Sequence, residues 1–286
     1  MINSETSITP EIAIENLNQK EDLGLRYYAA WWLGKFRVKT SLGVESLINA
    51  LKDEEDRAPD GGFPLRRNAA KALGKLEDLR AVEPLIKCFE CDDYYVRESA
   101  AQALEMLGDS RAIQPLINLL DNAVKDDKLT DYAIEPVIGK PYLNQPYEAI
   151  IEALGTLNAQ NALNLVKPFL NHPTPKIAYA SARAMYQLTN DDTYGEILVT
   201  ALQGKELQLR RSALMDLGAI GYVKSGEAIS KAYAENSLKL IAMKGLLEHQ
   251  LKLDYGQFDR QRLLSDRTQE LSSDSIHLMD LMDQLL

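Results

Sequence analysis

The chain has 286 residues, of which 45% are hydrophobic and 26% are charged, a composition that excludes wholesale disorder. Its formal net charge of −10 argues against a nucleic-acid partner, because an acidic protein repels phosphate backbones. No apolar run approaches the ~20 residues of a membrane span and no signal-peptide pattern is present, so we expect a cytoplasmic protein with no membrane partner.

A tandem repeat dominates the sequence. Its two clearest copies read LRRNAAKALGKLEDLRAVEPLIK from residue 65 and VRESAAQALEMLGDSRAIQPLIN from residue 96. Each copy predicts an alanine-rich first helix with apolar residues at i, i+4, i+5 and i+8, and a second helix with a proline in its first turn. Weaker first helices begin near residues 25, 147, 177, 209 and 238. One hairpin cannot bury both faces, so residues 1–264 are predicted to form an all-α, right-handed α-solenoid of about six hairpins.

Two long segments, 52–64 and 121–146, interrupt the period. Each falls between a second helix and the next first helix, so both are expected on one edge of the solenoid. The longer segment includes Val137, Ile138 and Tyr142, which make it too apolar for a simple linker. We expect it to fold back over a surface, and no segment of the chain reads as an alternating strand.

The C-terminal residues 265–286 differ from the repeats. They begin with the polar sequence SDRTQELSSDS, which reads as a linker, and end with IHLMDLMDQLL, which reads as a short amphipathic helix. A terminal helix of this kind either caps the array or docks on a partner.

Cys88 and Cys91 form a C-x-x-C pair. A structural zinc would need two further ligands, and His172, His249 and His277 are far apart in the sequence. The pair ends a helix, whereas a redox pair usually begins one. We therefore expect two ordinary thiols, no metal site, and no catalytic residue that spacing alone identifies.

Charged residues recur in register with the repeat. Four first helices carry an arginine near their start and two turns carry an aspartate: Arg26, Arg66, Arg97, Arg210, Asp78 and Asp109. The interpretation that we favour is an Arg–Asp ladder between repeats, and the alternative is a row of cations for an acidic ligand.

The sequence YYAAWWL at residues 27–33 departs from the other copies. The positions equivalent to Tyr27 and Trp31 are mostly charged elsewhere, so these two rings are predicted to face outward and to bind a flat ligand or a partner. The positions equivalent to Tyr28 and Trp32 are small elsewhere, so these rings are predicted to pack on an N-terminal cap helix. The alternative is that all four aromatics serve the cap.

The repeat pattern R-x-x-A-A-x-A-L-G, the early sequence YYAAWWLGK and the chain length together resemble the E-type subunits of the heterodimeric phycobilin lyases of cyanobacteria. The resemblance covers essentially the whole chain, and YYAAWWLGK is its most specific element. It implies that the hairpins are HEAT-like. It also implies that Tyr27, Tyr28, Trp31 and Trp32 serve bilin or partner binding.

The resemblance implies an activity as well. Such a chain attaches phycocyanobilin through a thioether bond to a cysteine of the apo-phycocyanin alpha subunit, together with a homologous F-type subunit. Phycocyanobilin is then the substrate, and no cofactor is expected. The alternatives are a subunit of the phycoerythrocyanin lyase–isomerase and a non-catalytic HEAT scaffold that binds a phycobiliprotein.

Overall fold

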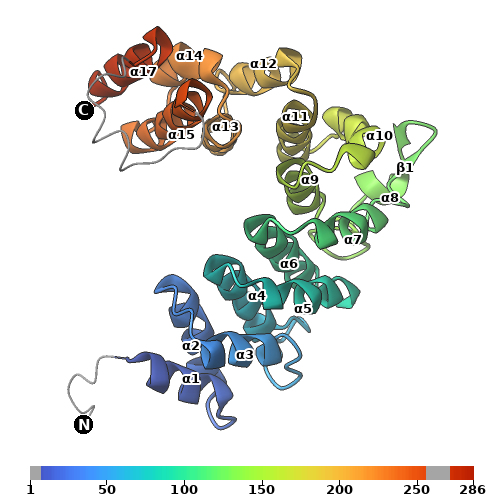
Figure 1. The fold of residues 1–286 in the computed structure, drawn as a ribbon. Coiled ribbons are helices and arrows are strands. Elements are labelled where there is room, and N and C mark those ends of the chain that lie inside the picture. The colour runs from blue at the N-terminus through green and yellow to red at the C-terminus, as the bar shows by residue number, and fades with distance from the viewer. Residues whose placement is uncertain (1–7, 256–270) are drawn as a thin grey trace. The chain divides into compact units, whose positions relative to one another are not determined.

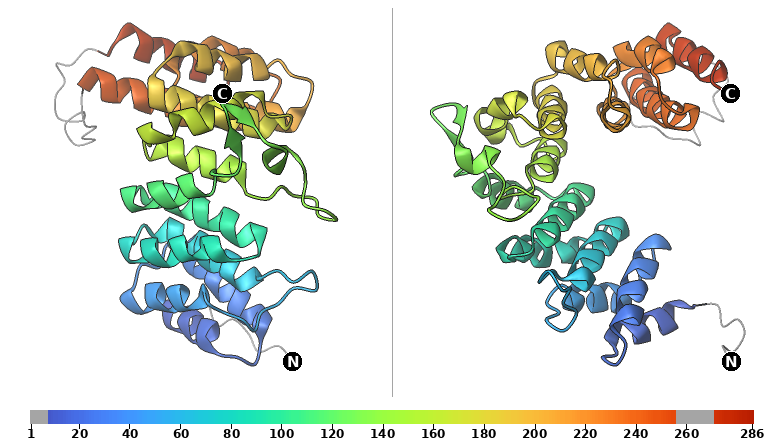
Figure 2. Two further views of the ribbon diagram at one scale, coloured as in Figure 1. Left: turned by 90° about the vertical axis from the view of Figure 1, so that its right-hand side faces the viewer. Right: turned by 180° about the vertical axis from the view of Figure 1, so that it is seen from behind.

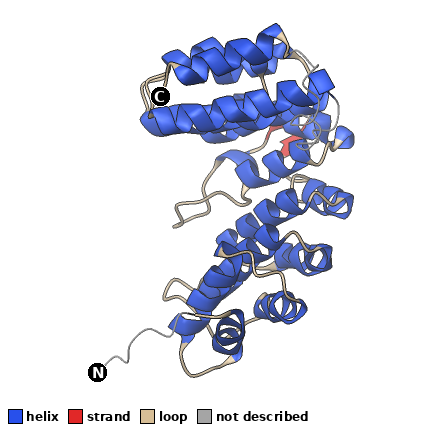
Figure 3. Cartoon of the chain, turned by 60° about the vertical axis from the view of Figure 1, so that its left-hand side comes forward, coloured by secondary structure: helices blue, strands red, loops and turns tan. Residues whose placement is uncertain are grey.

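The computed structural model describes residues 8–255 and 271–286, and it divides into two compact units, Met1–Pro168 and Phe169–Leu286. Both units consist almost entirely of helices that run back and forth in pairs (Figure 3). The prediction of an all-α repeat architecture is therefore confirmed. Residues 265–270 of the predicted linker lie outside the described residues.

The first unit holds the helices that follow (Figure 1). They are α1 (Pro10–Asn18), α2 (Leu23–Lys35), α3 (Ser41–Ala50), α4 (Pro64–Leu76), α5 (Val82–Lys87), α6 (Tyr94–Leu107), α7 (Ile113–Asn118), α8 (Asp131–Ile134), α9 (Tyr147–Thr156) and α10 (Leu163–Val166). Short 3-10 turns lead into or extend the second helices: η1 (Leu79–Ala81), η2 (Cys88–Glu90), η3 (Ser110–Ala112), η4 (Gln160–Ala162) and η5 (Lys167–Asn171).

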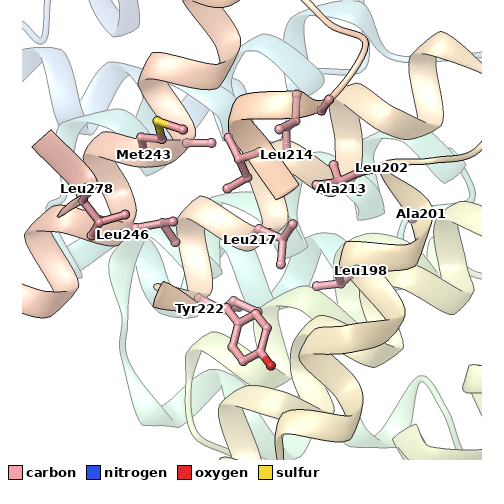
Figure 4. Close-up of a cluster of buried hydrophobic side chains, with 14 of the residues drawn as sticks. Leu198, Ala201, Leu202, Ala213, Leu214, Leu217, Tyr222, Met243, Leu246 and Leu278 are labelled. Atoms are coloured by element: carbon pink, nitrogen blue, oxygen red, sulfur yellow. The ribbon is translucent and has the colours of Figure 1, made fainter. Parts of the chain in front are cut away.

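The second unit contains α11 (Pro175–Thr189), α12 (Asp192–Ala201), α13 (Leu207–Ile220), η6 (Val223–Ser225), α14 (Gly226–Lys231), α15 (Asn236–Tyr255) and α17 (Ser273–Asp283). Its core is made by aliphatic side chains from α12, α13, α15 and α17, among them Leu198, Leu217 and Leu246 (Figure 4). Tyr222 closes this core, and its hydroxyl group donates a 2.6 Å hydrogen bond to Glu196.

First helices stack directly on one another in the first unit, where α2, α4 and α6 lie side by side (Figures 1 and 2). Small residues set the spacing. A Cβ atom added to Gly34 of α2 would lie 2.7 Å from the Ala72 Cα atom of α4, and one added to Gly74 would lie 2.8 Å from the Ala103 Cα atom of α6. The repeated alanine and glycine positions therefore let the backbones approach closely.

One pair of short strands interrupts the helices. Residues Val124–Lys125 (β1) and Lys128–Leu129 (β2) form a small antiparallel hairpin within the long segment 121–146. Strands of two residues cannot show an alternating pattern, so periodicity could not reveal them. Asp126 and Asp127 make the connecting turn with positive φ values of 50° and 58°.

The terminal helix α17 caps the second unit. Leu278 and Leu281 are buried and face Gly226 of α14, where an added Cβ atom would lie 3.0 and 3.3 Å from their methyl groups. The Ser275 hydroxyl group donates a 3.0 Å hydrogen bond to Asp254 of α15. Of the two roles considered for this helix, the structure therefore supports the cap.

The predicted Arg–Asp ladder was wrong in its partners. Asp78 and Asp109 pair within their own turns with Arg80 and Arg111, at 2.8 and 2.9 Å. Each aspartate is two residues from the arginine in its own turn, so it pairs with that arginine more readily than with one in the next repeat. The side chain of Arg80 holds the pKa of Asp78 down at about 2.

The recurring first-helix arginines instead hold the connections between repeats. Arg26 pairs with Asp53 at 2.5 Å, and Arg66 donates a 2.6 Å hydrogen bond to the Asp53 carbonyl group. Arg97 donates to the Asn144 carbonyl group at 2.9 Å, and Arg210 donates to the Gly204 carbonyl group at 2.7 Å. Arg66, Arg97 and Arg210 thus hold backbone of the connecting segments, whereas Arg26 pairs with a side-chain carboxylate in one of them.

Candidate functional site

The aromatic residues of α2 lie on its surface. The Asp22 carboxylate caps this helix by accepting a 3.0 Å hydrogen bond from the Leu25 N–H group. Tyr27 and Trp31 are 44% and 38% exposed, which confirms the prediction that they face outward. The Lys35 ammonium group lies 4.6 Å from the centroid of the Trp31 ring, a cation–π contact.

The prediction that Tyr28 packs against the cap helix was wrong. Tyr28 is 44% exposed, and its ring lies 5.3 Å from that of Trp31. Successive residues turn by about 100° on a helix, so Tyr28 lies about 100° from Ala29 and about 160° from Ala30, outside the buried face. Trp32 is half-buried, and its ring lies 4.8 Å from the exposed ring of Phe36. Three of the four predicted aromatics are therefore exposed, and Trp32 is partly covered.

The later repeats explain why these rings are uncovered. The equivalents of Leu25, Tyr28, Trp32 and Phe36 are buried in α4 and again in α6: Leu65, Asn68, Ala72, Leu76, Val96, Ser99, Ala103 and Leu107. They are buried because they face the preceding first helix; Asn68, for example, donates a hydrogen bond to the Tyr27 carbonyl group of α2 at 3.2 Å. Within the described residues, α2 is preceded by α1, which packs on α2 but does not cover these positions.

We call Leu25, Tyr28, Trp32 and Phe36 the end face of α2. Helix α1 covers the neighbouring side of the hairpin, where the Arg26 guanidinium group donates to the Leu17 carbonyl group at 3.3 Å, but it leaves the end face open. Terminal repeats of soluble solenoids normally carry a polar outer face. An open end face made of large apolar residues is therefore a surface suited to binding another molecule.

A second candidate site lies where the two long segments meet. Segments 52–64 and 121–146 project from the same edge of the first unit (Figure 2, left), as the sequence predicted. Between them is a pocket of about 520 Å³, which we call the insertion pocket. Its lining residues are Arg57, Asp60, Gly61, Gly62, Phe63, Arg67, Asp92, Asp93, Tyr95, Lys140, Pro141 and Tyr142.

Aromatic rings form one wall of the insertion pocket. Tyr142, from the longer segment, stacks on Tyr94 of α6 with ring centroids 4.8 Å apart and meets the edge of Tyr95 at 5.9 Å. This contact confirms that the longer segment folds back over a surface. Burial raises the pKa of the Tyr94 hydroxyl group to about 12, so Tyr94 stays neutral at ordinary pH.

Arginines line the pocket beside these rings, and the Arg67 guanidinium group lies 4.6 Å from the centroid of Tyr95. The Phe63 ring has the Arg57 and Arg66 guanidinium groups 3.9 Å from its centroid. Asp93 caps α6 and accepts hydrogen bonds from the Phe63 N–H group at 2.7 Å and from Arg67 at 2.9 Å. Burial alone would raise the pKa of Asp93, but these hydrogen bonds lower it below its usual range.

Sequence reasoning did not find this pocket. The signals present were the tyrosine pair at 94–95, at the start of a first helix, and a third tyrosine in the long segment. The expectation that both long segments share one edge was the only clue that these tyrosines lie together. Their register against the repeat depends on contacts such as the Arg97 bond to Asn144, which no local pattern specifies.

The two cysteines are free thiols. Cys88 is buried, and burial raises the pKa of its thiol to about 12, in agreement with an unreactive role. Cys91 is half-buried, with the Arg66 guanidinium group 3.7 Å from its sulfur atom. Within residues 8–255 and 271–286, no group of three His, Cys, Asp or Glu side chains is placed to hold a metal.

Comparisons with known proteins identify the family of the chain. Residues 58–131 match the family model of HEAT repeats, and residues 25–53, which include α2, match that of the PBS lyase HEAT-like repeat. The chain is 57% identical over 279 residues to the phycocyanobilin lyase subunit alpha of Picosynechococcus sp., covering 97% of this chain and 96% of that protein. The chain belongs to the phycocyanobilin lyase alpha-subunit family.

Other relatives agree with this assignment. The phycocyanobilin lyase subunit alpha of Nostoc sp. is 55% identical, with 98% of this chain and 94% of that protein covered. A structure of the complex of CpcE and CpcF of phycocyanin lyase from Nostoc sp. PCC7120 contains a chain that matches with a TM-score of 0.86 at 53% identity, covering 100% of this chain and 98% of that one. The bilin biosynthesis protein PecE of Nostoc sp. is more distant, at 40% identity over 262 residues.

No helix in the described part of this lyase-family chain is both long and apolar enough to cross a membrane. The comparisons establish the family. They assign no role to the aromatic residues of α2 or to the insertion pocket.

Proposed function

We propose that this chain is the alpha subunit of a heterodimeric phycocyanobilin lyase, which attaches phycocyanobilin to a cysteine of the phycocyanin alpha subunit together with an F-type partner. The main support is that 97% of the chain aligns with a phycocyanobilin lyase subunit alpha at 57% identity. A cytoplasmic location suits a chain whose two cysteines are free thiols.

The reaction is an addition. The thiolate sulfur of the acceptor cysteine bonds to the ethylidene carbon of bilin ring A, and a proton is taken up on the ring, so no atom leaves and nothing is oxidised. The phycobiliprotein supplies the thiol, and the bilin is a substrate, so the lyase needs neither a nucleophile nor a cofactor of its own. Its contribution is to hold the bilin and the acceptor in a reactive arrangement and to limit wrong additions.

The end face of α2 is our candidate for the F-type partner's docking site. In α4 and α6 the same positions receive a helix of the neighbouring repeat, so the shape of this face suits a helix. The second unit already has its own cap, α17, at the other end of the chain. A homologous helical repeat protein is therefore the occupant that this surface fits.

Reconstitution tests the proposed function. The chain should be co-expressed with the F-type subunit, the apo-phycocyanin alpha subunit and the enzymes that make phycocyanobilin. We expect a covalently coloured, fluorescent alpha subunit when both lyase subunits are present and none when either is omitted. Unchanged bilin attachment in the absence of this chain would contradict the proposal.

The docking site has a separate test. Phe36→Glu places a charge on the end face and should weaken binding of the purified F-type subunit by at least about tenfold, because a charge buried at an interface without a partner is costly. Tyr233→Glu, at a ring that is 88% exposed in the second unit, is the matched control. Affinity is measured by calorimetry. Equal affinities of the two variants for the F-type subunit would contradict docking at the end face.

A further inference from the structure

The insertion pocket has the size and the walls of a small-molecule site. Its volume of about 520 Å³ lies within the usual range for ligand pockets, roughly 300–1,000 Å³. Tyr95 and Tyr142 expose ring surface to it, and both segments that interrupt the repeat contribute to its lining. The regular hairpins alone would not form this pocket. We therefore expect a binding role.

The pocket also carries uncommitted charges of both signs. Arg67 and Asp93 satisfy each other. By contrast, the exposed side chains of Asp92 and Lys140 form no hydrogen bond or ion pair with the described residues. Arg57 lies above the Phe63 ring and is partly engaged, with a 3.1 Å hydrogen bond to the Gly61 carbonyl group and an ion pair with Glu54 at 3.6 Å. Lys140 follows Gly139, whose φ of +72° makes the tight turn that brings it to the rim.

We infer that the insertion pocket binds the linear tetrapyrrole, an inference that rests on the proposed function. A tetrapyrrole is a flat conjugated molecule, which can stack on Tyr95 and Tyr142. Its two propionates carry negative charge and match the Lys140 and Arg57 cations. Its pyrrole N–H groups are donors and match the Asp92 carboxylate. One ligand thus accounts for rings, cations and an acid in the same pocket.

The end face of α2 fits the same molecule less well. Its rings lie on an open helix surface, and the Lys35 ammonium group already lies 6.0 Å from the centroid of Phe36 and 4.6 Å from that of the neighbouring Trp31. No carboxylate belongs to the end face, so nothing there would accept the pyrrole N–H bonds. The chemistry therefore separates the two surfaces: a helix of a partner suits the end face, and the bilin suits the insertion pocket.

Titration of phycocyanobilin into the purified heterodimer, without apo-phycocyanin, tests this inference through the change in bilin absorption. Lys140→Met and Asp92→Asn should each weaken binding by about three- to tenfold. The dimethyl ester of phycocyanobilin lacks the propionate charges. Lys140→Met should therefore leave the affinity for the ester unchanged, whereas Asp92→Asn should weaken both forms.

Lys128→Met is the matched control, because Lys128 is exposed in the same segment but does not line the pocket. Wild-type affinity of the Asp92→Asn, Lys140→Met double variant for the free acid, in a heterodimer that still transfers bilin, would overturn the inference and leave the proposed function standing. Loss of bilin binding on Phe36→Glu, with the pocket variants unaffected, would also overturn it. A wild-type heterodimer that transfers no bilin would contradict the proposed function itself.

Discussion

At the residue scale, one arginine position serves different acceptors in different repeats. Arg26 meets a buried carboxylate, whereas Arg97 and Arg210 donate mainly to backbone carbonyl groups of the adjoining connection. A guanidinium group has five N–H donors in a rigid fork, so it can satisfy several carbonyl groups that would otherwise be buried without partners. The four arginines therefore share a bonding role with the connecting segments and not one recurring acidic partner.

The first prediction concerns Arg97, which ties the longer segment to α6 through Asn144 and Gln145, at 2.9 and 3.1 Å. Arg97→Met should release this segment, making it cleavable within residues 121–146 by limited proteolysis and lowering the free energy of unfolding by about 1–3 kcal/mol. Arg97→Lys should restore little, because a single ammonium group cannot reproduce the fork. Wild-type cleavage rates in both variants would show that Arg97 does not hold the segment.

The second prediction concerns the thiols. Burial raises the pKa of the Cys88 thiol to about 12, so this thiol stays protonated and unreactive at ordinary pH. Iodoacetamide at pH 8 should therefore modify Cys91 first, as read by mass spectrometry of the folded chain. The Cys88→Ser, Cys91→Ser variant should keep most of its bilin transfer, because the acceptor thiol is on the phycobiliprotein. A bilin that stays on this chain after denaturation would contradict that expectation.

At the element scale, the first helices stack through glycine and alanine. Gly34→Ala should push α2 from α4, because its Cβ atom would lie 2.7 Å from the Ala72 backbone, and should cost about 1–3 kcal/mol. Gly24→Ala, in the same helix, meets only the Asp22 carboxylate at 3.2 Å and should be neutral or stabilising. Chemical denaturation compares the two, and similar losses at both sites would refute close packing as the cause.

The arrangement of the helices could be predicted from the sequence, but one ring and the insertion pocket could not. Helix pairs, their order and the exposure of Tyr27 and Trp31 followed from comparing equivalent positions across repeats. The same comparison failed for Tyr28, because positions averaged over interior repeats assume a preceding helix that covers them, and α1 does not cover Tyr28. The insertion pocket could not be predicted, because it depends on contacts between segments about 80 residues apart that no period describes.

At the scale of the whole molecule, the chain finishes its two terminal repeats differently. The first unit leaves an aromatic face open on α2, while the second unit covers its last hairpin with α17. The terminal repeats of an array expose apolar surface, so each terminal repeat must be capped or used for binding. Within the described residues, large apolar side chains are therefore exposed on α2, whereas α17 covers the last hairpin of the second unit.

The last prediction tests the cap. Leu278 of α17 is 1% exposed, so Leu278→Ala should lower the free energy of unfolding of the second unit by about 2–5 kcal/mol, the usual loss for a buried leucine. Ile276, on the same helix, is 46% exposed, and Ile276→Ala should cost under about 1 kcal/mol. Because two compact units need not unfold together, urea unfolding should be followed by a probe in each unit. If α17 served the partner instead, Leu278→Ala would weaken F-type subunit binding and leave the unfolding transition in place.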